Sequence, residues 1–315
     1  MIRLESQYIH YNNTLEAINR RAGEDPQAFA RDSEQAYQSQ LRQVAARAAG
    51  RTGDCGVVLL AGPSASGKTT TAHLLSEALR QEGVSSQVIS LDDFYLSEAD
   101  SPRLEDGRPD FESVYALDVP QIKECLLSLM ETRSCCMPVF DFATHRPKAK
   151  KRRVELPPHS LVILEGLHAL NPILSQGLPR GKLLHAYLSV KQGVEGEGGR
   201  PLLGPNDMRL VRRLVRDARF RACTAERTLD MWPSVMRGEY QYIKPFRPSA
   251  DLTINTFLAY EGCVLRGEAL ALLAQVPSSS PHWGEACRLR EAVAGFTPLP
   301  PSCVPEKSIL HEFLG

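Results

Sequence analysis

Short apolar runs alternate with helical segments along the middle of the chain. Residues 57–61 (VVLLA) and 161–164 (LVIL) are apolar throughout, which is typical of strands buried on both faces of a parallel sheet. Further strands are predicted at residues 87–90, 184–190 and 251–255, and helices at residues 68–81, 118–132 and 208–222. Because strands alternate with helices, we expect an α/β fold with a doubly wound parallel sheet of about five strands and flanking helices.

Polar, helix-forming segments flank this region on both sides. In the first, apolar residues recur at spacings of three to eight: Phe29, Tyr37, Leu41, Val44 and Ala48. We therefore predict an N-terminal helical extension over residues 1–53, docked on the main body and broken near residues 50–53. Residues 54–258 form the predicted main domain, and residues 259–315 a C-terminal helical extension. Its expected elements are residues 259–276, 284–295 and 308–315.

The charge balance argues against two broad classes of function. The 315 residues include 37 Lys+Arg and 37 Asp+Glu, so the chain lacks the excess positive charge of a general nucleic-acid or membrane-surface binder. No apolar stretch approaches the ~20 residues needed to span a bilayer, and the first ten residues lack the apolar core of a signal peptide. The eight cysteines show no metal-ligand spacing, which is typical of reduced thiols, although the adjacent Cys135 and Cys136 leave a redox pair open. We expect a cytoplasmic protein.

The turn after the first strand carries the most specific motif. Residues 62–69 fit G-x-x-x-x-G-K-[ST] between a buried strand and a helix, the context that this phosphate-binding loop requires. Its amides would face the phosphates at the positive end of the helix. Lys68 would bridge the β- and γ-phosphates, and the Thr69 hydroxyl would bind Mg²⁺. The predicted ATP-binding residues are Gly62, Ser64, Ala65, Ser66, Gly67, Lys68, Thr69 and Thr70.

The chain lacks the motifs of several other nucleotide-using classes. It contains no N-K-x-D for reading guanine, no LSGGQ-like signature and no helicase motif series. Acidic residues instead end two predicted strands, at Asp92–Asp93 and at Glu165, where ligands bind in open α/β sheets. Asp92 is the expected base for a substrate hydroxyl, the alternative being that Asp92 or Asp93 caps a turn. Glu165 is the expected second Mg²⁺ ligand, because a buried glutamate without a cation would be unfavourable.

Two basic runs have more than one interpretation. The spacing of Arg209, Arg212, Arg213, Arg216 and Arg219 predicts one guanidinium face on a helix. Such a face is often solvated, but in a kinase arginines on a mobile lid also stabilise the transferred phosphoryl group. Asp207 and Asp217 would pair with some of them. Residues 146–153 are interpreted as a solvated β-hairpin beside the substrate mouth rather than an RNA-binding or localisation signal.

These motifs resemble, in order, those of the phosphoribulokinase/uridine kinase family of P-loop kinases. The resemblance runs from about residue 56 to 255 and rests on GPSASGKTT, SLDDFY, PDFESVYALD, PVFDFATHR, ILEGLHALNP, RLVRRLVRDARFR and residues 242–251. It looks closest to bacterial uridine kinase-like nucleoside kinases with an N-terminal extension. The resemblance implies a P-loop NTPase-type sheet, a hairpin insertion at about residues 135–157 and a lid at about residues 206–240.

The resemblance also implies roles for individual residues. The catalytic group would be Asp92, Lys68 and Arg216, with Asp92 facing the 5′-hydroxyl of a nucleoside. The acceptor would be bound by Asp92, Tyr95, Glu112, Phe140, His145, Arg213 and Arg221. Glu112 would hold the ribose hydroxyls, while His145 and Phe140 would contact the base. A structural role for His145 is the alternative.

The sequence departs from the family pattern at three of these places. Glu112 replaces a shorter aspartate, Phe140 replaces a tyrosine and lacks its hydroxyl, and Arg221-Ala222-Cys223 stands where the family has R-G-R. We therefore expect an ATP- and Mg²⁺-dependent kinase acting on uridine or cytidine first. The alternatives are a kinase of a sugar or sugar phosphate and a regulatory module that senses ATP without turnover. The expected partners are ATP and a small hydroxylated acceptor, with no nucleic acid and no membrane, and a homo-oligomer is compatible with the sequence.

Overall fold

The computed structural model describes residues 10–50, 55–141 and 144–315, so all but the first residue of the predicted break at residues 50–53 lies outside the described part. Its strands are β1 His10–Thr14, β2 Gly56–Ala61, β3 Ser86–Ser90, β4 Ser134–Met137, β5 Phe140–Asp141, β6 Arg146–Pro147, β7 Arg152–Glu155, β8 Leu161–Glu165, β9 Leu183–Ser189, β10 Gln192–Glu195, β11 Pro201–Leu203 and β12 Leu252–Asn255. Its helices are α1 Leu15–Glu24, α2 Pro26–Ala49, α3 Lys68–Gln81, α4 Val119–Thr132, α5 Pro172–Ser175, α6 Pro205–Arg221, α7 Ala225–Tyr242, α8 Glu261–Leu273, α9 Trp283–Ala294 and α10 His311–Leu314.

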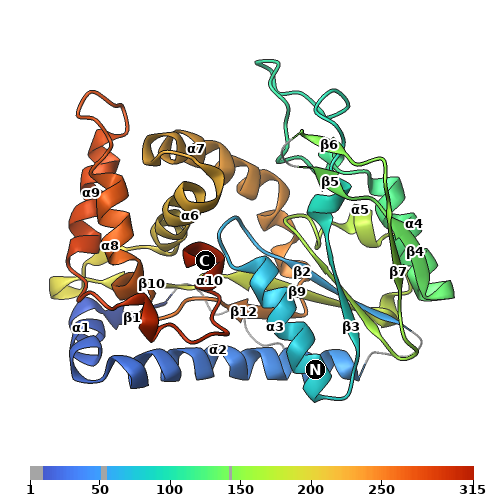
Figure 1. Ribbon diagram of the computed structural model, residues 1–315, viewed down its shortest axis with the longest axis horizontal. Coiled ribbons are helices and arrows are strands. Elements are labelled where there is room, and N and C mark those ends of the chain that lie inside the picture. Colours follow the sequence, from blue (N-terminus) through green and yellow to red (C-terminus); the bar gives the residue numbers. More distant parts are fainter. Residues whose placement is uncertain (1–9, 51–54, 142–143) are drawn as a thin grey trace.

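The central sheet has five parallel strands in the order β12-β9-β2-β8-β3, as the alternating pattern predicts (Figure 1). Strand β2 lies in the middle, and every one of its residues is buried. Val58 and Leu60 pack into the core beneath α2, α3, α6 and α8, whereas Val57 and Leu59 pack into the core beneath α4. Because successive side chains point to opposite faces, a strand covered on both sides is apolar throughout, and the doubly wound fold class is confirmed.

The insertion between α4 and β8 is antiparallel. Strand β4 pairs with β7, and β5 pairs with β6 farther along the same hairpin. Residues 144–153, which include the basic run, are exposed, in agreement with a solvated hairpin. None of the helices found in the described ranges combines the length and apolar character needed to cross a membrane.

The N-terminal extension is not helical alone, which corrects the prediction. It begins with β1, which pairs in parallel with β10, and β10 pairs in turn with β11. The amphipathic pattern did not reveal β1 because its pairing partner lies far along the chain. The apolar residues predicted to dock α2 are all buried: Phe29, Tyr37, Leu41, Val44 and Ala48. The Tyr37 hydroxyl lies 2.7 Å from Thr71 Oγ1 on α3, so the extension contacts the helix that follows the phosphate loop.

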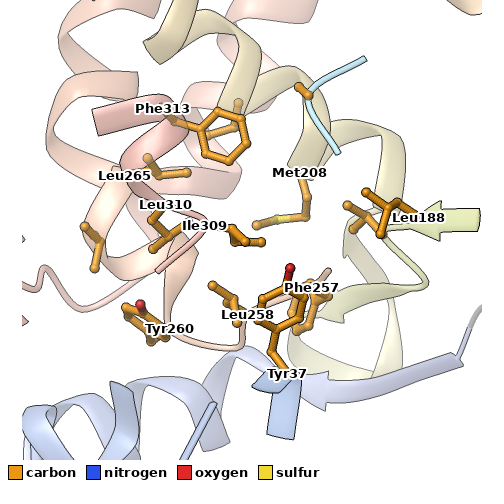
Figure 2. Packing of buried hydrophobic residues seen from close by; sticks show 14 of the residues in the cluster. Tyr37, Leu188, Met208, Phe257, Leu258, Tyr260, Leu265, Ile309, Leu310 and Phe313 are labelled. Carbon is orange, nitrogen blue, oxygen red and sulfur yellow. The ribbon is translucent and has the colours of Figure 1, made fainter. Parts of the chain in front are cut away.

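Both extensions join the core of the main domain. Figure 2 shows Tyr37 of α2, Met208 of α6 and Ile309, Leu310 and Phe313 near the C-terminus converging in one cluster. Helices α8 and α9 lie where the sequence predicts covering helices. The described parts of both extensions are therefore packed onto the face of the sheet that carries α3 and α6.

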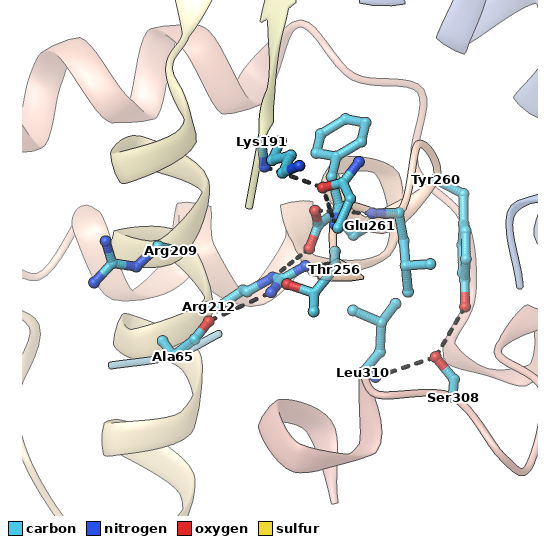
Figure 3. Close-up of polar contacts among 12 residues, drawn as sticks. Ala65, Lys191, Arg209, Arg212, Thr256, Tyr260, Glu261, Ser308 and Leu310 are labelled. Carbon is cyan, nitrogen blue, oxygen red and sulfur yellow. Dashed lines mark hydrogen bonds and ion pairs between the residues drawn. The ribbon is translucent and has the colours of Figure 1, made fainter. Parts of the chain in front are cut away.

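The predicted single guanidinium face of α6 is wrong, because α7, α8 and α10 surround the helix and its arginines point to different partners. Arg212 is fully buried and donates to the Glu261 carboxylate at 2.5 Å, the Thr256 carbonyl at 2.6 Å and the Ala65 carbonyl at 3.3 Å (Figure 3). Arg209 pairs with buried Glu239 at 2.7 Å, and Arg219 pairs with Glu268 of α8. These three arginines connect α6 to its neighbours.

Breaking the buried pair should destabilise the whole fold. We expect Arg212→Met to lower the free energy of unfolding by about 3–5 kcal/mol, because it leaves the Glu261 charge buried without a partner. Changing both residues to Met should recover most of that loss. Chemical denaturation measures both effects. Arg227→Met, at the exposed Arg227–Asp230 pair, is the control and should cost at most ~1 kcal/mol; an equal loss in Arg212→Met and the control would contradict the role of the buried pair.

Candidate functional site

The loop between β2 and α3 has the backbone shape of a phosphate cradle. Gly67 adopts a left-handed conformation with φ of 84°. A Cβ at Gly62 would lie 2.7 Å from Ser66 Oγ and 2.8 Å from Leu188 Cβ, so no side chain fits there. Ser66 Oγ is buried without a hydrogen-bond partner among the described residues. The loop therefore presents an unpaired hydroxyl at the start of a 14-residue helix whose first-turn amides lack carbonyl partners within the helix, an arrangement that favours an anion.

The sheet register brings the predicted acidic residues to this loop. Ser90 of β3 pairs with Glu165 of β8, and Glu165 pairs with Leu60 of β2. The three strands therefore end at one edge, with Asp92 in the turn just beyond β3 and Lys68 in the first turn of α3. Parallel strands with matched ends place their following loops side by side.

Thr69 and Glu165, the predicted metal ligands, are in contact. Glu165 Oε1 accepts hydrogen bonds from Thr69 Oγ1 at 3.3 Å and from Ser90 Oγ at 2.7 Å. Burial raises the pKa of Glu165 to about 7, while the nearby Lys68 charge opposes the rise. An added cation would stabilise the ionised carboxylate.

These two residues fit a Mg²⁺ ion that is shared with a nucleotide. The described part of the chain has no group of three His, Cys, Asp or Glu side chains that could hold a metal. Mg²⁺ in phosphate-transfer sites is commonly held by one or two protein oxygens, with phosphates and water completing the octahedron. A threonine hydroxyl beside a glutamate is a donor set of that kind.

Lys68 and Asp92 are close enough to influence each other's ionisation. Burial is the main influence on both: it lowers the pKa of Lys68 and raises that of Asp92. The Asp92 carboxylate acts against the first effect and the Lys68 ammonium against the second. Although the Asp92 side chain is accessible to solvent, the surrounding protein desolvates it enough to raise its pKa.

Asp93 points elsewhere. Its carboxylate accepts from the Phe140 amide at 3.4 Å and lies 3.4 Å from the Arg152 guanidinium, so it anchors the hairpin insertion. Asp92 makes no such structural contact within the described residues, and its amide donates to Ser90 Oγ at 3.3 Å. Of the two adjacent acids, Asp92 is the one available to a ligand.

The predicted acceptor residues are only partly brought together. Tyr95 packs against Phe140 at 5.8 Å between ring centroids and against Phe111 at 6.1 Å. Phe140 is 7% exposed, which leaves little of its ring surface for a ligand. His145 lies exposed in the turn between β5 and β6, and no contact between described residues joins it to the other candidates.

Glu112 lies under α7. Burial raises its pKa to about 7, and the Arg213 charge opposes the rise. A Cβ at Gly238 of α7 would come within 2.7 Å of Glu112 Cβ, so α7 approaches this residue as closely as a glycine allows. Buried His168 lies nearby, its ring 6.4 Å from that of Tyr242, and burial lowers its pKa to about 4. His168 was not among the candidates, although it stands in the ILEGLHALNP motif.

Three arginines of α6 share one carboxylate, that of Asp217. Its oxygens lie 3.1 Å from Arg213, 2.8 Å from Arg216 and 3.6 Å from Arg221, and the Asp217 side chain is 1% exposed. Arg213 also donates to Ser64 Oγ of the phosphate loop at 2.8 Å. Three guanidinium groups around one carboxylate leave an excess of positive charge beside the loop. The sequence suggested Asp217 as a partner, but not that it gathers these three arginines.

Comparisons with known proteins show the family. The model of the Phosphoribulokinase / Uridine kinase family matches residues 57–197. A uridine kinase of Borrelia hermsii is 31% identical over 200 residues, which cover 63% of this chain and 85% of that protein. A uridine kinase of Lactobacillus johnsonii is 29% identical over 204 residues, with the same 63% and 85% coverage.

Similar solved structures include a possible uridine kinase from Bacillus stearothermophilus. It has 22% identity and a TM-score of 0.43, and the match covers 64% of this chain and 89% of that one. D-glycerate 3-kinase from Cryptococcus neoformans has 16% identity and a TM-score of 0.44, with coverage of 65% and 88%.

Replacing Glu165 with Gln should change how stability depends on pH. Folding raises the pKa of this carboxyl from 4.5 to about 7, so wild type loses stability as the pH rises through this range and the buried group must ionise. Between about pH 5 and pH 8 the Glu165→Gln variant should gain about 2–3 kcal/mol in free energy of unfolding relative to wild type. Denaturant titrations at the two pH values measure the difference. Glu155→Gln, at an exposed residue, is the control; parallel pH curves for wild type and Glu165→Gln would refute the assignment.

Proposed function

The chain belongs to the phosphoribulokinase/uridine kinase family and is therefore a phosphotransferase, and we propose that it transfers the γ-phosphoryl group of ATP to the 5′-hydroxyl of a nucleoside, uridine or cytidine first. The observation that carries this proposal is the meeting of Lys68, Thr69, Asp92 and Glu165 at one edge of the sheet. The names of the similar uridine kinases support the choice of acceptor.

Asp92 acts as the base in the proposed reaction. Its carboxylate accepts the proton of the acceptor hydroxyl while the oxygen forms a bond to the γ-phosphorus and the bond to ADP breaks. The raised pKa of Asp92 favours this role, because a carboxylate with a higher pKa accepts a proton more readily. The acceptor hydroxyl thus gives its proton to Asp92 and receives the phosphoryl group from ATP, and ADP departs as the second product.

Positive side chains stabilise the charge on the transferred group. Lys68 binds the β- and γ-phosphates from the loop, and Arg216 approaches from the lid. Asp217 holds Arg216 through two hydrogen bonds of 3.0 and 2.8 Å, so this guanidinium is oriented before any substrate binds. Such preorganisation avoids the free-energy cost of reorienting charges during the reaction.

Thr69 and Glu165 are the proposed Mg²⁺ ligands. When bound, Mg²⁺ would neutralise charge on the phosphates. Glu165 is prepared for that role by its hydrogen bonds to Thr69 and Ser90, which fix the orientation of the carboxylate.

The acceptor side supports the nucleoside less directly. Glu112 is suited to hold two sugar hydroxyls. Burial raises the pKa of Tyr95, and the nearby Asp92 and Glu112 charges raise it further. Phe140 is buried against Tyr95, however, and His145 is exposed in its turn. The second candidate is therefore a kinase of a sugar or sugar phosphate, which needs no base contact, and the excess arginine charge around Asp217 favours a phosphorylated acceptor in that case. A sensor that binds ATP without turnover would have no use for the Asp92 base.

An acceptor panel tests the proposal. With Mg²⁺ and ATP, we expect kcat/KM for uridine or cytidine to exceed that for ribose, other sugars and sugar phosphates by at least ~10-fold, measured as ADP release. A sugar or sugar phosphate as the preferred acceptor would support the second candidate. ATP binding without turnover of any acceptor would support the sensor.

Two adjacent variants test the base. Asp92→Asn should lower kcat at least ~100-fold while the Kd for ATP stays within about twofold, because the base contacts the acceptor rather than ATP. Asp93→Asn is the matched control and should keep most of kcat, since Asp93 contacts the hairpin insertion. Initial rates and calorimetric titration give the two quantities. A larger loss in Asp93→Asn than in Asp92→Asn would move the base by one position.

A further inference from the structure

The C-terminal extension places a carboxylate at the phosphate loop. Glu312 lies on the short segment that ends the chain, and its Oε2 accepts a hydrogen bond from the Thr70 backbone amide at 3.3 Å. No sequence motif indicates this contact, because Glu312 and Thr70 are 242 residues apart. It is a side-chain contact from outside the family match of residues 57–197 to the loop that defines the family.

The Thr70 amide is one of the groups that a bound nucleotide would use. It belongs to the first turn of α3, where backbone amides have no carbonyl partner within the helix. The Thr71 amide, one residue later, already donates to the Gly67 carbonyl at 2.9 Å. In a loop of this type the free amides bind α- and β-phosphate oxygens. The Glu312 carboxylate therefore occupies a position suited to a phosphate oxygen.

The segment that carries Glu312 is fixed. Ile309, Leu310 and Phe313 are fully buried, as Figure 2 shows for their side chains. The Arg212 guanidinium lies 5.2 Å from the centre of the Phe313 ring, and Arg219 donates to the Leu314 carbonyl. The backbone is therefore held, while the Glu312 side chain is only partly buried.

The charge of Glu312 influences the pKa values of two cationic side chains, Lys68 and Arg221. It opposes the lowering of the Lys68 pKa that burial causes, together with Glu165. Burial lowers the pKa of Arg221 as well, and Glu312 opposes that change together with Asp217 and Asp92. The Glu312 carboxylate, at the positive end of a helix and near two cations, is therefore stabilised by the same charges that would stabilise a phosphate.

We propose that Glu312 is a residue of the donor site, whose carboxylate competes with the nucleotide phosphates for the Thr70 amide and so weakens nucleotide binding. The nucleotide displaces this side chain when it binds. The inference rests on the proposed function as far as ATP is the nucleotide, but it concerns only the phosphate loop and not the acceptor. The C-terminal extension thereby sets the nucleotide concentration at which the site fills.

Two substitutions at Glu312 test the competition. Glu312→Gln removes the charge and keeps the side-chain length, and Glu312→Ala removes the acceptor as well. Both should lower the Kd for MgATP and for inorganic triphosphate at least threefold, as measured by calorimetric titration. Inorganic triphosphate is included because it engages the loop without a base or a sugar. Glu306→Gln is the matched control. It makes the same charge change at an exposed residue elsewhere in the C-terminal extension and should leave both Kd values unchanged.

The outcomes separate this inference from the proposed function. Thermal unfolding first establishes that each variant is folded. If wild type binds ATP and phosphorylates an acceptor while both Glu312 variants bind ATP equally well or more weakly, the competition is refuted and the kinase stands. If the variants bind triphosphate more tightly but no acceptor is phosphorylated, the competition stands and the kinase is refuted. If none of the proteins binds ATP or triphosphate, both are refuted.

Discussion

The buried guanidinium of Arg212 is the interaction on which the arrangement of the site depends. It lies at the point where four parts of the chain meet: it belongs to helix α6 and binds the phosphate loop through Ala65, the end of β12 through Thr256 and α8 through Glu261. A buried charge is unfavourable unless its donors have partners, so these contacts stabilise the arrangement in which the three parts meet at Arg212. The same guanidinium faces Phe313, which fixes the final segment beside the loop. The arrangement of the phosphate loop, α8 and the end of β12 thus depends on the contacts of one buried guanidinium group.

The site combines carboxyl groups whose burial disfavours their ionisation with neighbouring cations that favour it. Burial raises the pKa of Asp92, Glu112 and Glu165, and the neighbouring positive charges lower it. A carboxyl group whose pKa is raised in this way takes up a proton more readily, and a bound cation or hydrogen-bond donor would stabilise its ionised form.

The sequence predicts the central fold well because the signals are local. Strands buried on both faces are apolar runs, and the phosphate loop is a contiguous motif between a strand and a helix, so both can be recognised from a short window. The acids at the ends of β3 and β8 follow from the same local pattern. Strand β1 and the contact of Glu312 with Thr70 depend on partners distant in the chain. The arginines of α6 show a third limit: their spacing is helical, but burial by three other helices decides which carboxylate each one meets.

The close approach of α7 to Glu112 at Gly238 has a consequence for how such a protein diversifies. The distance between α7 and Glu112 depends on the absence of a side chain at Gly238, a residue that itself presents no functional group. A larger residue there would push α7 and Glu112 apart. A single substitution would thus change the surroundings of Glu112 without altering Glu112 itself. Gly238 is therefore the residue of α7 at which a substitution would most directly change the surroundings of Glu112.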